Sequence, residues 1–247
     1  MNKVELKYSN LSSLDLLDIY YPDKPNGEVI INFHGGGFTC GSKNDDSQCE
    51  LGKEFSDLGY TFVSVDYSLY PNTQFPNYLV EASKAVKFIC DYLQIKHPFI
   101  TGQSAGAWLA MMMCFSNYLK DEGIDPLDIK GWIFESGQPT SHFNIMNIEK
   151  GEDPYIQRID EIAPLFYIKP DVKMSPALVV LYKEDLPNRY EQNKLMISAI
   201  RNYNKAADIT ELLLPGGHCA SSTIRDEKGK FPFVKAVLPW LKSKQKD

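Results

Sequence analysis

Short apolar runs alternate with stretches of helical character along most of this chain. Val29–Phe33 precedes a helical stretch at Cys49–Leu58, and Thr61–Val65 precedes a longer one at Tyr78–Leu93. Strands that alternate with helices form βαβ units, in which the strands pair in parallel. The runs are continuously apolar, as expected of strands covered on both faces. The pattern predicts an α/β fold with a mainly parallel central sheet and helices on both of its faces.

The alternation continues to the end of the chain, whose 247 residues, 43% of them hydrophobic, are sufficient for one substantial core. We therefore expect a single domain over residues 1–247. Leu14–Tyr21 is expected to pair as an antiparallel edge strand. The remaining strands are expected at Pro98–Thr101, Trp132–Phe134, Ala177–Tyr182 and Ile209–Leu214, and the remaining helices at Ala105 to about Tyr118, Arg189–Asn204 and Phe231–Lys242.

Residues 138–175 interrupt this alternation. The segment is rich in isoleucine, tyrosine and phenylalanine, yet it lies between two expected strands. Long insertions in compact domains often serve a function. We interpret the segment as a crossover helix with a small lid, in preference to an ordinary surface excursion.

The net charge of the chain is −6, whereas nucleic-acid binding normally requires a basic face. One basic group, at Lys242, Lys244 and Lys246, is interpreted as a solvated chain end. The N-terminus lacks an apolar signal-peptide region, and no apolar stretch of roughly 18 residues occurs. We expect a cytoplasmic protein without nucleic-acid or membrane partners. Five scattered cysteines without a CxxC pair predict neither disulfides nor a zinc site.

The pentapeptide Gly102-Gln103-Ser104-Ala105-Gly106 stands between a short expected strand and a helix. A GxSxG motif at such a junction places its serine on a sharp, strained turn, which the small neighbours permit. The serine Oγ then projects beyond the sheet, and the amide of Ala105 at the helix N-terminus can stabilise an oxyanion. The motif and its context predict Ser104 as a nucleophile.

His34-Gly35-Gly36-Gly37-Phe38, here called the glycine loop, follows a buried strand. Three consecutive glycines expose unhindered N–H groups, as an oxyanion hole requires. The loop lacks the GxGxxG and GxxxxGK[ST] patterns of dinucleotide and phosphate sites. We therefore interpret it as part of an oxyanion hole rather than as a plain turn.

A nucleophilic serine needs a base, and elimination among four histidines leaves one. His34 belongs to the glycine loop, His97 precedes a strand at the wrong end of the sheet, and His142 lies in the insertion. His218 directly follows the last strand, at the carboxyl edge where such sheets bind ligands. We expect His218 to be the general base.

A carboxylate after the preceding strand should orient this histidine. Glu184 and Asp185 both qualify, and Asp185 is preferred because it lies in the turn toward the next helix. The resulting order of Ser104, Asp185 and His218 along the chain is that of α/β hydrolases.

HGGGF, GQSAG and the late DL…GGH elements together resemble the hormone-sensitive-lipase-like group of α/β hydrolases. Asp66–Pro71, continued by Phe75-Pro76, is similar to a D-Y-R-L-x-P…F-P stretch of that group, although Ser68 replaces its arginine and Tyr70 an alanine. The short chain is closer to small carboxylesterases, among them feruloyl, acetyl-xylan and kynurenine-formamidase-like enzymes. In those proteins a Gly-x-x-Asp form is common where this chain has Lys183-Glu184.

The resemblance implies the α/β-hydrolase fold and a function in ester hydrolysis. The expected triad is Ser104, Asp185 and His218, and the expected oxyanion hole consists of the amides of Gly36, Gly37 and Ala105.

The function predicted from these residues is that of a serine hydrolase which cleaves short-acyl carboxylic esters through an acyl-enzyme, without a metal or organic cofactor. An amidase or formamidase would use the same fold and triad, and a non-catalytic ligand-binding homologue is a further alternative. Phe38 and Tyr67 are expected to contact the small-molecule substrate. Cys40 and Cys219 are interpreted as inert small side chains. A homodimer is expected by analogy with such folds.

Overall fold

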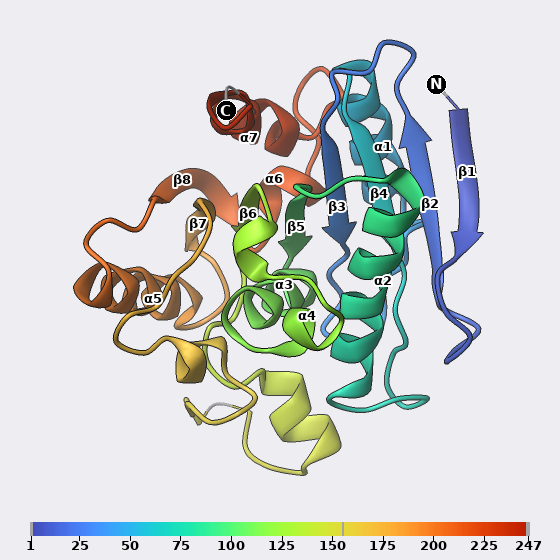
Figure 1. Ribbon diagram of the computed structural model, residues 1–247. Helices are drawn as coiled ribbons and strands as arrows, with labels where there is room; N and C mark the ends of the chain where they lie inside the picture. The colour runs from blue at the N-terminus through green and yellow to red at the C-terminus, as the bar shows by residue number, and fades with distance from the viewer. Residues whose placement is uncertain (1, 155, 246–247) are drawn as a thin grey trace.

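The computed structural model describes residues 2–154 and 156–245, and within them the chain forms one eight-stranded sheet (Figure 1). The strands lie in the order β1-β2-β4-β3-β5-β6-β7-β8. All pairs from β4 to β8 are parallel, so the carboxyl ends of these strands meet at one edge of the sheet. The predicted α/β fold is confirmed. The strands span Asn2–Lys7 (β1), Leu16–Tyr21 (β2), Val29–Phe33 (β3), Thr61–Val65 (β4), Phe99–Gln103 (β5), Gly131–Glu135 (β6), Ala177–Glu184 (β7) and Ile209–Gly217 (β8).

The first edge of the sheet differs from the expectation. β2 is antiparallel to both of its neighbours, as predicted for Leu14–Tyr21, but β1 and not β2 is the outermost strand. The hydrophobic pattern does not indicate β1, because all six of its residues are exposed or half-buried and half of them are charged. A solvated edge strand needs little apolar surface, so periodicity hardly marks it.

Helices cover both faces of the sheet. One apolar layer joins side chains of α2, α3 and α5 to one face, and a second joins α1 and α7 to the other. In Figure 1, α2 and α3 lie in front of the sheet. The expected helix from Ala105 to about Tyr118 is divided in two. The helices are α1 (Asp46–Asp57), α2 (Asn77–Leu93), α3 (Ala105–Phe115), α4 (Tyr118–Asp121), α5 (Arg189–Tyr203), α6 (Ala220–Thr223) and α7 (Pro232–Ser243), with a short 3-10 turn η1 at Pro126–Asp128.

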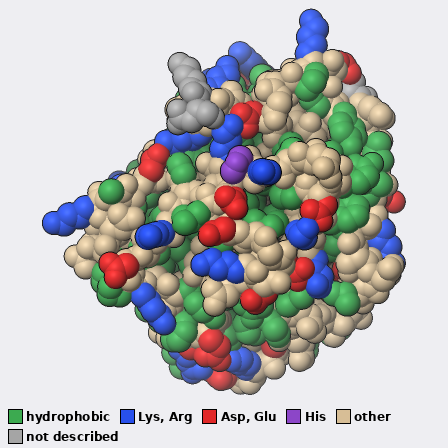
Figure 2. Space-filling model, viewed as in Figure 1, with side chains coloured by type: hydrophobic (Ala, Val, Ile, Leu, Met, Phe, Trp, Pro, Cys, Tyr) green, Lys and Arg blue, Asp and Glu red, His purple; other side chains and the backbone are tan. Residues whose placement is uncertain are grey.

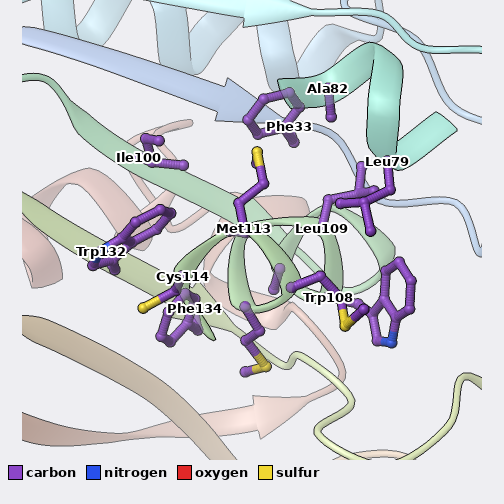
Figure 3. Packing of buried hydrophobic residues seen from close by; sticks show 14 of the residues in the cluster. Phe33, Leu79, Ala82, Ile100, Trp108, Leu109, Met113, Cys114, Trp132 and Phe134 are labelled. Atoms are coloured by element: carbon purple, nitrogen blue, oxygen red, sulfur yellow. The ribbon is translucent and has the colours of Figure 1, made fainter. Parts of the chain in front are cut away.

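The helix after Ser104 lies inside the molecule. Ten of the eleven residues of α3, all but Phe115, are buried, which suits a helix that is apolar all round. Figure 3 shows Met113 of α3 beside Phe33 of β3, and Leu109 beside Leu79 of α2. Because close-packed surroundings leave such a helix little freedom, its N-terminus is a rigid place for a reacting group.

Residues 138–175 connect β6 to β7 without the expected crossover helix. The described part of the segment contains one π-helical turn, η2 (Ile145–Glu149), and one 3-10 turn, η3 (Pro164–Tyr167). Trp108 Nε1 in α3 donates to the carbonyl oxygen of Ile162 at 3.1 Å and anchors the segment. Figure 1 shows it in yellow-green and yellow at the bottom of the view, where the arrowheads of β3 and β5 point.

The visible surface carries charges of both signs. Figure 2 shows lysine and arginine side chains interspersed with aspartate and glutamate, without a continuous basic stripe on this face. Near the C-terminus, Lys244 pairs with Asp208, whereas Lys246 lies outside the described residues. Among the helices that the structure describes, none combines the length and the apolar character needed to cross a bilayer.

Candidate active site

Ser104 occupies the turn between β5 and α3 in a strained backbone conformation, with φ 53° and ψ −112°. The turn requires two glycines. A Cβ on Gly106 would lie 2.0 Å from the carbonyl oxygen of Phe33, and a Cβ on Gly102 would lie 2.3 Å from the backbone of Gly106. Both obstacles are backbone atoms that cannot move aside. The GxSxG spacing therefore allows this tight strand-to-helix turn, as its sequence suggested.

His218 lies against Ser104 and Asp185. Its Nε2 is 2.8 Å from Ser104 Oγ, and its Nδ1 is 2.5 Å from Asp185 Oδ1. Each of the three residues directly follows the last residue of its strand, β5, β7 or β8. In this arrangement the His218 imidazole can take the proton of the serine hydroxyl, and Asp185 can stabilise the resulting imidazolium.

The choice between two carboxylates is decided by pairing of β7 with β8. A register irregularity between Tyr182 and Glu184 pairs Glu184 with Gly217, which places the next residues, Asp185 and His218, side by side. The Asp185 side chain is 3% exposed, whereas Glu184 is exposed. Asp185, and not Glu184, is the carboxylate in contact with the histidine.

Asp185 is stabilised as an anion. Burial raises its pKa, but hydrogen bonds from His218 and Ser136, a hydrogen bond from the Leu186 amide and the attraction to His218 outweigh burial. The pKa of Asp185 therefore lies below its usual value. The buried guanidinium of Arg189 adds a positive charge nearby, although burial lowers the pKa of Arg189 itself to about 10.

The glycine loop turns sharply beside the serine, with φ 112° at Gly36 and 60° at Gly37. The carbonyl oxygen of Gly36 accepts hydrogen bonds from the amides of Thr39 and Cys40, at 3.0 and 3.1 Å. Within the described residues, the amides of Gly36 and Gly37 have no acceptor. Ala105 is the first residue of α3, so its amide belongs to the unsatisfied first turn of that helix. These three N–H groups are available to an oxyanion.

Phe38 and Tyr67 support the glycine loop from inside the core and do not line the cavity. Each is 1% exposed, and Phe38 stacks on Tyr78 at 4.3 Å between ring centroids. Tyr67 stacks on His34 at 4.4 Å and donates from Oη to the carbonyl oxygen of His34 at 2.8 Å. Neither ring borders the cavity above Ser104, so the structure offers no surface of either for the expected substrate contact.

The other histidines lie outside the reacting group. His97 contacts the carbonyl oxygen of Asp128 at 2.7 Å, ahead of β5 and thus at the opposite edge of the sheet. His142 is fully buried, 4.6 Å from the ring of Phe38. Burial lowers the pKa of both His34 and His142, which favours neutral rings. The described residues contain no cluster of three or more His, Cys, Asp or Glu side chains suited to a metal.

A ring of three buried amides forms part of the floor of the site. Asn32 Nδ2 donates to Gln48 Oε1 at 2.5 Å, Gln48 Nε2 to Gln103 Oε1 at 3.5 Å, and Gln103 Nε2 to Asn32 Oδ1 at 2.9 Å. The ring joins β3, α1 and β5 directly before the nucleophile. Sequence patterns carry no signal for it, since each amide comes from a different element.

A cavity of about 470 Å³ opens above Ser104 and His218. Backbone atoms of the glycine loop and several polar side chains line it, and Phe143 and Leu186 are its larger apolar side chains. Phe143 and Asn144 come from residues 138–175, so this segment covers part of the site. The other lining residues are His34, Gly35, Gly36, Gly37, Cys40, Gly41, Asp45, Ser47, Gln48, Gln103, Cys219, Ser222 and Thr223.

The chain resembles known proteins over different lengths. A family model described as BD-FAE matches residues 17–148, more than half of the chain. The fold is similar to esterase B from Lactobacillus Rhamnosis (TM-score 0.76, 16% identity, 98% of this chain and 84% of that one). It is also similar to the butyrate-bound esterase Est2 from Thermogutta terrifontis (TM-score 0.75, 16% identity, 97% and 92%). At this identity, the two structures show the fold alone.

A curated relative matches only locally. The FAD-linked oxidoreductase pytB from Aspergillus terreus is 37% identical over 95 residues. The match covers 37% of this chain and 12% of that protein's length, so it concerns a shared segment and not the whole relative.

Proposed function

Because the chain belongs to the BD-FAE family, we propose that it is a serine hydrolase that cleaves carboxylic esters. The observation that carries this proposal is the continuous hydrogen-bonded chain from Asp185 through His218 to Ser104. Two solved proteins of the same fold, esterase B and Est2, are esterases, which supports it.

In the proposed reaction, His218 takes the proton of Ser104 Oγ as that oxygen attacks the ester carbonyl. Asp185 keeps the imidazole oriented and stabilises the imidazolium. His218 then protonates the leaving alkoxide, which departs as the alcohol. Water attacks the acyl-enzyme by the same route and releases the carboxylic acid.

The amides of Gly36, Gly37 and Ala105 would hold the tetrahedral oxyanion. Their support is the acceptor-free glycine loop beside the N-terminus of α3. Loss of one such donor typically costs about 3 kcal/mol of transition-state stabilisation.

We expect a preference for short acyl groups. Phe143 and Leu186 are the larger apolar side chains beside the nucleophile, and they offer apolar contact to a short acyl group. The butyrate bound to the Thermogutta esterase supports the same acyl size. Residues 138–175 would act as a small lid, because Phe143 and Asn144 reach from them over the nucleophile.

The test is hydrolysis of p-nitrophenyl acetate, butyrate and octanoate by the wild type, Ser104→Ala and Ser83→Ala. Ser83 is a buried serine of α2 whose hydroxyl bonds to Leu79, so its replacement controls for the loss of a buried hydroxyl. We expect turnover that falls with chain length, is unchanged in Ser83→Ala and is abolished in Ser104→Ala. A phosphonate should form a covalent adduct at Ser104.

Ester turnover that persists in Ser104→Ala would refute the proposal. A phosphonate adduct at Ser104 without ester turnover would point to an amidase or formamidase. If the folded protein shows neither an adduct nor ester turnover, it is a ligand-binding homologue.

A further inference from the structure

A buried carboxylate that the proposed reaction does not use lies behind the nucleophile and the base. Glu135 ends β6 and is fully buried. Its carbonyl oxygen accepts the amide hydrogen of Ser104 at 2.8 Å, so the two residues are in contact across neighbouring strands. A buried charged side chain is costly unless it is well paired, which calls for a physical reason.

The Glu135 carboxylate is tied to the segment that follows His218. Its Oε1 accepts from Tyr182 Oη at 2.5 Å and from Ser221 Oγ at 2.8 Å. The Ser221 amide in turn donates to Tyr182 Oη at 3.0 Å. Ser221 lies in α6, three residues beyond the base. The carboxylate thus joins the ends of β6 and β7 to the backbone that carries His218.

The neighbouring residue completes this junction. Ser136 Oγ accepts the amide hydrogen of Cys219, the residue after His218, at 3.2 Å. The backbone at Cys219 is left-handed, with φ 53°, so the exit from His218 is held in one conformation. Glu135 and Ser136 together contact the chain at the nucleophile, the acid and the base.

Charge also links Glu135 to His218. Burial raises the pKa of Glu135 above its usual value, and hydrogen bonds from Ser222, Tyr182 and Ser221 together with attraction to His218 offset only part of that rise. Ser104 from the β5–α3 turn and Asp185 after β7 contact His218 directly. Glu135 of β6 and His142 of residues 138–175 interact with it through charge, and Arg189 of α5 interacts with Asp185. Burial favours a neutral ring at His142, and the charge of Arg189 acts on Asp185. Asp185 and Glu135 are therefore the two carboxyl groups whose charge acts on His218.

We propose that Glu135 is a positioning residue for His218, whose carboxylate anchors α6 and whose negative charge favours the imidazolium formed in the reaction. This inference rests on the proposed serine-hydrolase function, which it extends by a second buried carboxyl group besides Asp185. It assigns no contact with substrate to Glu135.

The first test compares Glu135→Gln with Tyr182→Phe. Glu135→Gln keeps an oxygen acceptor but removes the charge, whereas Tyr182→Phe removes a donor of the same network and keeps the charge. For Glu135→Gln we expect kcat to fall roughly tenfold with KM within about twofold, because the lost interaction serves the transition state. The acid limb of the pH profile of kcat should move to lower pH in Glu135→Gln, since the His218 imidazolium loses a stabilising negative charge. Tyr182→Phe should leave the acid limb in place.

A second readout needs no substrate. The ring-proton resonances of His218, identified by their loss in His218→Asn, are followed by NMR against pH in the wild type and Glu135→Gln. The midpoint should move down by roughly half a pH unit or more. If the wild type hydrolyses no ester but this shift is found, the proposed function fails while the coupling between Glu135 and His218 stands.

An unchanged kcat and an unchanged NMR midpoint in folded Glu135→Gln would overturn the inference. Equal losses of kcat in Glu135→Gln and Tyr182→Phe without a midpoint shift would reduce Glu135 to a purely structural group, which also overturns it. If Glu135→Gln does not fold, Glu135→Asp withdraws the carboxylate by one methylene. It should then show a smaller shift in the same direction, and no shift would contradict the inference.

Discussion

Asn144 donates a hydrogen bond from Nδ2 to the carbonyl oxygen of Gly37 at 2.7 Å, across 107 positions of the chain. The bond fastens residues 138–175 to the glycine loop. The carbonyl of Gly36, which shares a peptide plane with the Gly37 amide, is held by the amides of Thr39 and Cys40. The bond from Asn144 holds the next peptide plane, on the other side of the left-handed Gly37. The covering segment and the proposed oxyanion hole are therefore mechanically connected.

Replacing Asn144 by alanine should loosen this connection. We expect kcat/KM to fall about tenfold, less than the 10²–10³ typical of losing an oxyanion donor itself, because the amide remains but is less well oriented. The unfolding free energy should change by about 1 kcal/mol or less, the usual net value of one hydrogen bond. Steady-state kinetics and urea unfolding test both values. Asn147→Ala, on an exposed residue of the same segment, should behave as wild type, and equal kinetics of the two variants would contradict the prediction.

Much of this site follows from where strands end. Ser104, Asp185 and His218 each stand directly after an apolar run, and such runs are visible as patterns in the sequence. Parallel pairing then brings all three to one edge. The apolar runs do not indicate the register in which neighbouring strands pair. The irregularity that pairs Glu184 with Gly217, and so selects Asp185, depends on how β7 and β8 meet.

The hydrophobic pattern and the motifs of the sequence do not indicate which side chains of distant segments are in contact. Asn144 and Glu135 stand in no motif, and their partners lie in other elements. Phe38 and Tyr67 illustrate the converse. Their position next to the glycine loop suggested substrate contact, but an aromatic ring beside a loop can face either the cavity or the core. Here the backbone at Phe38, with φ 65°, belongs to a turn that places its ring in the core, and Tyr67 after β4 packs there as well.

Asp185→Asn should reduce kcat by about 10⁴, because an amide does not hold the imidazole in the required tautomer or stabilise its charge. The exposed neighbour offers a matched control, and Glu184→Gln should retain wild-type turnover. Ester hydrolysis at saturating substrate compares the two. A larger loss in Glu184→Gln than in Asp185→Asn would mean that the acid is assigned to the wrong residue.

The same substitution should alter the pH dependence of stability. The pKa of Asp185 lies below its usual value, despite burial, through its bonds to His218 and Ser136. A depressed folded-state pKa stabilises the folded protein above the unfolded value near 3.8, and the stabilisation is lost as the pH falls through the folded pKa. The difference in unfolding free energy between wild type and Asp185→Asn should therefore be flat from about pH 7 to 5 and shrink below about pH 4. A difference that grows on acidification would have the wrong sign.

Gly106→Ala should prevent stable folding. The added Cβ would lie 2.0 Å from the carbonyl oxygen of Phe33, and backbone packing at the end of β3 leaves no room to relax. We expect a loss of more than about 3 kcal/mol, at the upper end of overpacking costs. Gly123→Ala is the matched control. Its backbone is left-handed but its surroundings are open, so it should lose only about 1–2 kcal/mol. Thermal unfolding measures the loss of stability in both variants. Equal losses would contradict the steric explanation.

Two cysteines near the site should differ in reactivity toward N-ethylmaleimide. Cys40 is exposed and lines the cavity beside Gly36, whereas Cys219 is 4% exposed and burial raises the pKa of its thiol well above the usual value. Since the thiolate is the reactive form, Cys219 should remain unmodified in the folded protein. An adduct on Cys40 should obstruct the cavity and lower turnover in proportion to labelling. Peptide mass mapping identifies the labelled residue, and Cys40→Ala should resist inactivation. Inactivation of Cys40→Ala at the wild-type rate, with label on Cys219, would show that the chain around His218 opens far more readily than its packing indicates.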